Sequence, residues 1–378
     1  MKTNLKKLLY SGVTLMSLGV LAACSTASSS TTTSSSITTS QSSTTSRNST
    51  SSDSSSSSID WSALPTTEVT LSNDGLKITE GGTYILTGST TAGVTVETDA
   101  NVRIILAGAD ISSSDTAAIN VIKADNVELE IKDGTSNTVK DTSNHSDTNI
   151  EGAIHVEADL TITGNGNLTV EGNFQDGIVS TDDLVINASN IKVTAVDDGI
   201  RGKDSLTING GTIDVTAGGD GIKSTNDTDT TKGYTTITGG DITVKAGDDG
   251  IKAETALTID GGTITVSESL EALEGTNITI NGGTLDVYGS DDAINAASTT
   301  STDIFIKVTG GDLKVAVGSG DTDAFDANGD IYISGGTIDV TAQSAFDFDG
   351  TAELTGGTVT VNGEQMSQIV ATGPGARW

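Results

Sequence analysis

An internal repeat constrains the fold of this chain more than any other feature of its sequence. The stretch "DDGIRGKDSLTINGGTIDVTA" is followed by "GDGIKS", so that Ile200 returns as Ile222. One apolar residue, which we call the anchor, holds this place in each unit. A fixed period of about 22 residues is typical of solenoid proteins, in which each unit packs against its neighbours. The anchors are Ile178, Ile200, Ile222, Ile251, Leu273, Ile294, Phe325 and Phe346, with looser copies at Ile119 and Ile154.

Each unit contains three short runs in which apolar and polar residues alternate. In one unit these are the anchor, "LTI" at 206–208 and "IDV" at 213–215. Alternation with a period of two turns one side of a strand inward. Glycine pairs such as Gly210-Gly211 separate the second run from the third, and glycine permits the positive φ of a sharp corner. The pattern predicts an all-β fold, a single-stranded right-handed parallel β-helix, and it disfavours a solenoid of alternating helices and strands because no unit has a helical period.

Two steps between anchors are longer than the rest, from Ile222 to Ile251 and from Ile294 to Phe325. The extra residues are polar inserts, "TNDTDTTKG" in the first step and "STTSTD" with "GSGDT" in the second. Inserts confined to one place in a repeat are expected to be loops on a regular scaffold.

Composition narrows the possible partners. Hydrophobic residues make up 34% of the chain and aromatic residues 3%, which suits a thin core of Ile, Val and Leu. The formal net charge of −32 excludes nucleic acid and an anionic membrane surface as partners, because both repel a polyanion. The charge favours cations, neutral ligands, or anionic ligands bridged by a divalent metal. We expect the protein to be a monomer.

The N-terminal part of the chain, residues 1–58, indicates export. Three lysines precede a short apolar run that ends in Leu-Ala-Ala-Cys, so we expect residues 1–23 to be a lipoprotein signal peptide. This ending resembles the lipobox of bacterial lipoproteins, which implies cleavage before Cys24 and lipidation of its sulfur. The alternative is an ordinary secretory signal with an incidental cysteine. With a lipid on Cys24, the protein would be held on the extracellular face of the bacterial cell membrane.

Residues 24–58 begin with Cys24 and continue as almost pure Ser and Thr, so we expect a disordered linker. Residues 59–378 would then form the β-helix domain. Because Cys24 is the only cysteine, the chain can form no intramolecular disulfide.

An acid recurs two residues before the anchor. Stacked carboxylates repel one another by roughly 1 kcal/mol in water and about 4 kcal/mol at an effective dielectric constant of 20. Bound cations would offset this repulsion, and oxygen ligands at this density favour Ca²⁺. This column consists of Asp176, Asp198, Asp220, Asp249, Glu271, Asp292 and Asp323. The candidate calcium ligands are Asp197, Asp198, Asp220, Asp248, Asp249, Glu271, Asp291, Asp292, Asp323 and Asp326.

Other roles for these charges stay open. Asp-Gly is also good turn chemistry, in which the Asp side chain bonds its own backbone. Four basic residues stand beside the earlier acids and would compensate their charge: Arg201, Lys203, Lys223 and Lys252. The later acids, including Glu274 and Asp326, have no basic residue near them in sequence.

The same phrases resemble a known family. "DDGIRGKDSLTINGGTIDVTA", "DDGIKAETALTIDGGTITV", "LEALEGTNITINGGTLDV", "DDAINAA" and "DANGDIYISGGTIDV", in this order, are similar to bacterial carbohydrate-binding β-helix proteins that bind cellulose and pectic polysaccharide. The resemblance implies a pectate-lyase-like right-handed β-helix that binds calcium and has no established catalysis. The acids it implies as ligands are Asp198, Asp220, Asp249, Glu271, Glu274, Asp291, Asp292 and Asp323.

The chain departs from this family in two places. Alanine replaces the glycine after the acid at Ala272, Ala293 and Ala324, and since alanine tolerates a positive φ poorly, these corners are expected to differ. The sequence also ends soon after "GGTVTVNGEQMSQIVATGPGARW", so we expect the last coil to be less well covered and to leave an open edge.

Three functions remain in view. The first is calcium-assisted, non-catalytic binding of a pectic or other polysaccharide. No aromatic residue recurs in a column that could stack sugar rings, so the carbohydrate-binding residues are unknown, and Phe325, Phe346 and Phe348 are expected in the core. The second is a calcium-dependent polysaccharide lyase, with Arg201, Lys203, Lys223 or Lys252 as base. The third is an adhesive rod without a sugar site. His145 in a polar loop and His155, expected to point outward, do not look catalytic.

Overall fold

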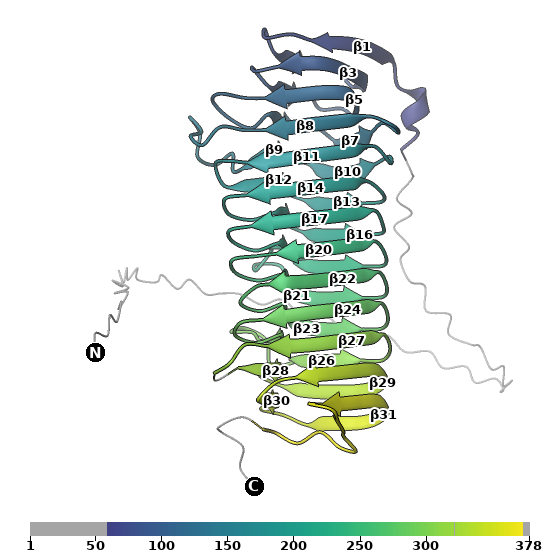
Figure 1. The fold of residues 1–378 in the computed structure, drawn as a ribbon. Helices are drawn as coiled ribbons and strands as arrows, with labels where there is room; N and C mark the ends of the chain where they lie inside the picture. The colour runs from purple at the N-terminus through teal and green to yellow at the C-terminus, as the bar shows by residue number, and fades with distance from the viewer. Residues whose placement is uncertain (1–58, 321, 373–378) are drawn as a thin grey trace, which may run out of the picture. The chain divides into compact units, whose positions relative to one another are not determined.

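The anchors stack on one another from coil to coil, as the repeat predicts. In a computed structural model, which describes residues 59–320 and 322–372, Ile178 pairs with Ile200 and Ile200 with Ile222 in parallel register. The same parallel pairing continues along the described chain, so the fold is the predicted parallel β-helix (Figure 1). A short 3-10 turn, η1 (Trp61–Ala63), precedes the first coil. None of the described residues belongs to a helix long and apolar enough to span a membrane.

Each coil has three faces, which we name A, B and C in chain order. Face A carries the anchors and consists of β2 (Leu76–Ile78), β4 (Val94–Glu97), β6 (Ile119–Lys123), β9 (Gly152–Val156), β12 (Asp176–Ser180), β15 (Ile200–Gly202), β18 (Ile222–Ser224), β25 (Ile294–Ala296), β28 (Asp323–Ala327) and β30 (Ser344–Phe348). Face B consists of β7 (Asn126–Ile131), β10 (Asp159–Thr163), β13 (Asp183–Ile186), β16 (Ser205–Ile208), β19 (Tyr234–Ile237) and β26 (Phe305–Val308).

Face C, with β14, β17 and β20, is turned toward the viewer in Figure 1. It consists of β8 (Ser136–Lys140), β11 (Asn167–Gly172), β14 (Asn190–Ala195), β17 (Thr212–Ala217), β20 (Asp241–Lys245), β22 (Thr263–Glu268), β24 (Thr284–Gly289) and β27 (Asp312–Val317). Some strands bend around a corner without a break. From face B to face C these are β1 (Thr66–Leu71), β3 (Gly82–Thr90), β5 (Val102–Ser112), β29 (Asp330–Thr341) and β31 (Ala352–Val361), and from face A to face B they are β21 (Ile251–Ile259) and β23 (Leu273–Ile280).

Two kinds of glycine shape the coil, and only one of them needs a positive φ. In the Gly-Gly pairs between the second and third strand runs, such as Gly210-Gly211, the second glycine lies at the corner between faces B and C with a positive φ, +102° at Gly211, as predicted. Gly199 of the Asp-Gly element does not have a positive φ. There a Cβ atom would lie 2.3 Å from Val215 Cγ1 and 2.4 Å from the Gly221 carbonyl oxygen. Close packing therefore requires glycine at this position, whereas its φ does not. The expectation that alanine after the acid would be strained by a positive φ is wrong.

The equivalent position is alanine in three later coils. Ala272, Ala293 and Ala324 are fully buried and continue the coil in parallel register. The interior of the described coils is filled by Ile, Val and Leu. Near the C-terminal end, Phe325 and Phe346 are fully buried, as predicted, and their rings stack with centroids 5.2 Å apart. Phe348 is half-buried and packs against the core.

The last coils are covered in part by the chain itself. After β31 the chain turns back as β32 (Glu364–Gln365), which pairs antiparallel with it. The Thr372 nitrogen donates to the Phe346 carbonyl at 2.9 Å, and the Thr372 hydroxyl accepts from the backbone nitrogen of Ala345 at 2.8 Å. Thr372 therefore covers part of the edge of β30. β32 pairs only with Thr360 and Val361, so the rest of the β31 edge has no further strand among the described residues, in keeping with the expected open edge.

Candidate cation and carbohydrate site

The repeated aspartates form a hydrogen-bonded ladder at the entrance to face A. The Asp198 nitrogen donates to Asp176 Oδ1 at 3.1 Å, the Asp220 nitrogen to Asp198 Oδ1 at 2.9 Å, and the Asp249 nitrogen to Asp220 Oδ1 at 2.9 Å. All four side chains are buried. Asp176, Asp198 and Asp220 therefore each bind the backbone of the next coil, and the bond to their own backbone that turn chemistry suggested is not formed.

The second carboxylate oxygen of each ladder residue meets a basic side chain. Arg201 bonds Asp176 Oδ2 at 2.9 Å and also contacts Glu151. Lys223 lies between Asp198 Oδ2 at 2.6 Å and Asp220 Oδ2 at 2.9 Å. These contacts match the charge compensation predicted for the two residues. Because both oxygens of Asp198 and Asp220 are engaged, these two acids are poorly placed to serve as a cation site by themselves.

The ladder is interrupted where glutamate replaces aspartate at Glu271. Asp249 Oδ1 is buried and, when Glu271 and Glu274 are ionised, has no hydrogen-bond donor within the described residues. Instead, Asp249, Glu271 and Glu274 bring carboxylate oxygens within 4.8 Å of one another, and we call these three residues the central cluster. Lys252 is the one basic residue that pairs with this cluster in the described chain, through Asp249 Oδ2 at 2.7 Å and through Glu274. Glu274 therefore does have a basic partner, one coil away, that its sequence neighbourhood did not reveal.

The central cluster brings together more carboxyl groups than its surroundings can keep ionised. Burial raises the pKa of Glu271 to about 9, and Asp249 raises it further. Burial and Asp249 likewise raise the pKa of Glu274 to about 8. Burial opposes ionisation of Asp249 too, but hydrogen bonds from Glu274, Glu271 and Lys252 hold its pKa at about 2. Without a cation, burial and the neighbouring carboxylates therefore favour the protonated form of the two glutamates.

The chemistry of this cluster fits a hard divalent cation. Its donors are carboxylate oxygens, and Asn295, whose Nδ2 lies 3.4 Å from Glu271 Oε1, has a buried Oδ1 without a hydrogen-bond donor among the described residues. Ca²⁺ takes six to eight oxygen ligands in flexible geometry. Of the ligands predicted from sequence, Asp249 and Glu271 are brought together here.

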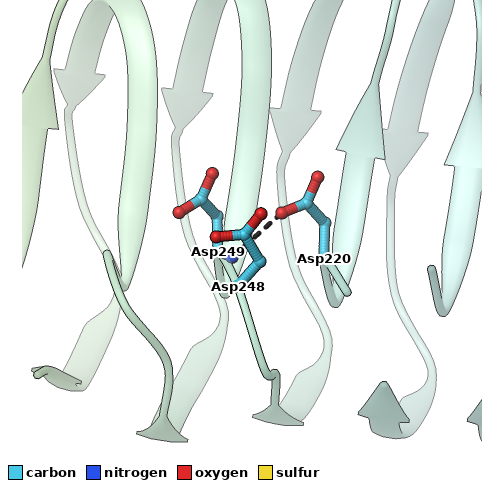
Figure 2. A group of neighbouring side chains, drawn as sticks. All are labelled: Asp220, Asp248 and Asp249. Carbon is cyan, nitrogen blue, oxygen red and sulfur yellow. Dashed lines mark hydrogen bonds between the residues drawn. The ribbon is translucent and has the colours of Figure 1, made fainter. Parts of the chain in front are cut away.

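A second group adjoins the central cluster through Asp249. Asp220, Asp248 and Asp249 also bring carboxylate oxygens within 4.8 Å of one another, and Figure 2 shows Asp220 and Asp249 joined by the ladder bond, with Asp248 beside them. Asp248 is exposed as a residue, but its carboxyl group is partly shielded from water. This partial burial raises its pKa, and the neighbouring Asp249 raises it further. Asp197 holds the same exposed place at an earlier step of the ladder, beside Asp198, and burial raises its pKa as well.

The remaining predicted ligands lie in the C-terminal coils. The Asp323 nitrogen donates to Asp292 Oδ1 at 2.7 Å, which resumes the ladder. Burial raises the pKa of Asp292 to about 6 and that of Asp326 to about 7, and neighbouring acids add to both shifts. Within residues 59–320 and 322–372, no basic side chain pairs with Asp291, Asp292 or Asp326. These acids do not gather as closely as the central cluster.

The residue after each anchor forms a second column, which we call the outer column. Strand pairing stacks these residues in register along face A. Their charge changes from positive to negative along the chain. From the anchor Ile178 onward the column reads Val179, Arg201, Lys223, Lys252, Glu274, Asn295, Asp326 and Asp347.

A small cleft of about 200 Å³ lies at the corner between faces A and B, near Arg201, Lys203 and His155. His155 follows the inward anchor Ile154 and faces this cleft, as alternation predicted, but it is buried. Burial, with the nearby Arg201, lowers its pKa to about 4. His155 is therefore neutral at pH 7. Lys203 is exposed and pairs with no acid in the described part of the chain.

His145 is also buried, although its sequence setting suggested a polar loop. Its ring stacks on Phe174 with centroids 4.3 Å apart, and its Nε2 lies 3.0 Å from Asp141 Oδ2. Its Nδ1 lies 2.5 Å from the Ile150 carbonyl oxygen. These contacts hold the loop of residues 141–150 against the coil. His145 therefore has a structural role that the sequence pattern did not indicate.

Comparison with known proteins decides the family. The pattern of the family described as carbohydrate-binding domain-containing proteins matches residues 72–324, about two thirds of the chain. The chain belongs to this family. A curated protein of the same description from Acetivibrio thermocellus is 37% identical over 135 residues, which are 34% of this chain and 47% of that protein. The chain thus spans about half the length of this relative.

A solved structure shares the fold of this carbohydrate-binding domain protein. The polysaccharide lyase-like protein from C. thermocellum, solved as a gadolinium derivative, aligns with a TM-score of 0.54 and 32% identity. The alignment covers 58% of this chain and 95% of that one. The matched family region includes the ladder from Asp176 to Asp323, whereas Asp326 and Asp347 lie beyond it.

Proposed function

We propose that this protein is a cell-surface lipoprotein whose β-helix binds polysaccharide without cleaving it, assisted by Ca²⁺. Membership of the carbohydrate-binding domain family supports the polysaccharide partner. The single observation that carries the calcium part is the central cluster, in which three carboxylates face one ammonium group.

Calcium would bind at the central cluster through Asp249, Glu271 and Glu274, with the Asn295 amide oxygen near Glu271. The cation would supply the positive charge that the cluster lacks. Resemblance in fold to a protein solved as a gadolinium derivative is in keeping with this, since lanthanides are hard cations that prefer oxygen ligands.

The C-terminal part of face A suits anionic sugars only when a cation intervenes. Asp292 and Asp326 have no basic partner among the described residues, so a uronate carboxylate would meet like charge there. A calcium ion shared between these acids and a uronate would remove the repulsion. A pectic polysaccharide is therefore a suitable ligand in the presence of Ca²⁺.

Non-catalytic binding fits the basic residues better than a lyase does. A lyase needs a free base beside the metal, and Arg201 is held by Asp176 and Glu151 while Lys252 is held by Asp249 and Glu274. One observation keeps the lyase as a second candidate: the small cleft holds neutral His155 beside Lys203, in a fold shared with a polysaccharide lyase-like protein. An adhesive rod without a sugar site is the third candidate.

Anchoring belongs to the same proposal. The signal peptide of residues 1–23, the lipid on Cys24 and the linker of residues 24–58 lie outside the described residues. With a lipid on Cys24, the β-helix would be presented at the extracellular face of the membrane.

A binding assay tests this function. The full chain is passed over a panel of insoluble and gel-bound polysaccharides, with calcium or with chelator, and the retained fraction is measured. We expect retention on pectic polysaccharide that is lost with chelator, and no unsaturated product in the flow-through. Accumulation of unsaturated product would establish the lyase instead. Failure to bind any glycan in either buffer would leave the adhesive rod.

A further inference from the structure

Two polar inserts leave face A at the same corner of the coil and stand on either side of a cleft. The first, residues 225–233, joins β18 to β19, and the second, residues 297–304, joins β25 to β26. Two coils without an insert lie between them, so the walls are three coil steps apart, roughly 14 Å. The enclosed cleft has a volume of about 530 Å³ and is separate from the small cleft near His155.

The floor of this corner cleft is made by β21 and β23, which pass from face A to face B without a loop. Their pairing shifts register between Ala253 and Ala256, so that Glu254 and Thr255 oppose Thr276 alone. Such a β-bulge re-aims side chains and is common beside functional sites. The bulge places Glu254 in the lining of the cleft, half-buried and without a side-chain hydrogen bond or ion pair to any described residue.

The lining is polar and mostly accepts hydrogen bonds. Four carboxylates face one ammonium group, Lys252, which is already paired with Asp249 and Glu274. Hydroxyls from threonine and serine in both inserts and the floor complete the surface, and no aromatic side chain of the described residues lines it. The carboxylates are those of Asp227, Asp229, Glu254 and Glu274.

We infer that the corner cleft is a glycan subsite for a sugar segment that bears no carboxylate, crossing the rod between the two inserts. Sugar hydroxyls donate to the carboxylates of the floor and wall, and such charge-assisted bonds are stronger than bonds between neutral groups. A uronate is repelled, because the lining holds an excess of negative charge. This inference rests on the proposed polysaccharide binding and adds a second site. The site shares Glu274 with the central cluster, but its other carboxylates, Asp227, Asp229 and Glu254, accept hydrogen bonds without calcium.

Two substitutions in the full chain test the subsite. Glu254→Gln removes a carboxylate that has no hydrogen bond or ion pair within the described chain, and Thr299→Trp places a large ring on an exposed position of the wall. Matched controls are Glu268→Gln, an exposed acid of face C, and Thr302→Trp, an exposed position of the same insert outside the cleft lining.

Binding is measured by titration calorimetry with cellohexaose, xylohexaose, a glucosamine hexamer and a galacturonate hexamer, each with calcium and with chelator. We expect at least one carboxylate-free hexamer to bind in chelator. Glu254→Gln should weaken this binding by about tenfold, the loss of one charge-assisted bond, and Thr299→Trp should weaken it by filling part of the cleft. Both controls should bind within twofold of the parent protein, and the cleft variants should leave calcium-dependent galacturonate binding unchanged.

Two results would overturn the subsite and leave the proposed function standing. In the first, both cleft variants bind a carboxylate-free hexamer as tightly as the parent protein does. In the second, the parent protein binds only the galacturonate hexamer. An absence of binding to all four hexamers and to the polysaccharide panel would overturn both.

Discussion

Asp198 Oδ1 lies 2.9 Å from the backbone nitrogen of Asp220, one coil further along the chain, and accepts its hydrogen bond. The other oxygen of Asp198 lies 2.6 Å from Lys223 Nζ. One buried side chain thus satisfies an amide of the next coil and an ammonium group of the outer column. The ladder aspartates therefore stabilise the β-helix, whether or not they also take part in a binding site.

Asp198→Ala should lower the free energy of unfolding by about 2 to 3 kcal/mol, because it leaves a buried amide without an acceptor and removes a charged partner. Asp198→Asn keeps a side-chain oxygen for the amide and should destabilise less. Urea unfolding followed by circular dichroism measures both. If asparagine proved as harmful as alanine, the ladder bond would contribute nothing and the ion pair would carry the effect.

Gly199→Ala should lower the free energy of unfolding by about 1 to 3 kcal/mol, because its Cβ would lie 2.3 Å from Val215 Cγ1 and 2.4 Å from a backbone carbonyl. Gly275→Ala is the matched control, since the nearest atom to its Cβ is 3.3 Å away, and it should change stability by less than about 1 kcal/mol. Equal effects of the two changes in thermal unfolding would show that packing does not select Gly199.

Calcium should raise the midpoint of thermal unfolding of the full chain, because a ligand that binds only the folded state stabilises it. At a calcium concentration 100 times the dissociation constant, the gain is about 2.7 kcal/mol. Glu271→Gln should remove most of this gain, whereas Glu268→Gln, an exposed acid outside the clusters, should preserve it. Identical midpoints with calcium and with chelator would contradict the cation site.

Asp326→Asn should stabilise the protein at pH 8 in chelator and have little effect at pH 4. Burial and neighbouring acids raise the pKa of Asp326 from 3.8 to about 7. Between these values the unfolded chain releases the proton while the folded chain keeps it, so this carboxyl destabilises the fold increasingly as pH rises. The expected gain at pH 8 is about 1 to 2 kcal/mol after allowance for screening by solvent.

Urea midpoints across this pH range measure the Asp326 effect. Asp312→Asn, at an exposed position of face C, is the control and should show no such dependence. A gain from Asp326→Asn that was the same at pH 4 and pH 8 would contradict the assigned cause.

The repeat predicted the fold because the signals are local. Alternation around each anchor, the Gly-Gly corners and the polar inserts all depend on residues close in sequence, and each has its predicted place, with Gly211 at positive φ as an example. The reason for Gly199 could not be predicted, because the atom that excludes a side chain belongs to Val215 on another face of the coil.

The candidate site was predicted only in part, because many of its contacts join residues that are far apart in sequence. The acid column followed from the period, but the partner of Asp198 Oδ1 and the pairing of Glu274 with Lys252 join different coils. His155 is buried by Arg201 and its neighbours, although alternation alone placed it outside. The central cluster had one usable signal, the change from aspartate to glutamate at Glu271.

The outer column makes the rod electrically polar along its length. Because parallel stacking converts sequence order into position, Arg201 and Lys223 fall in earlier coils and Asp326 and Asp347 in later ones. A mobile counter-ion near face A therefore experiences a potential that falls steadily toward the C-terminal coils. In the absence of calcium, such a gradient shifts a long polyanionic polymer away from the C-terminal coils and toward the N-terminal coils of this face.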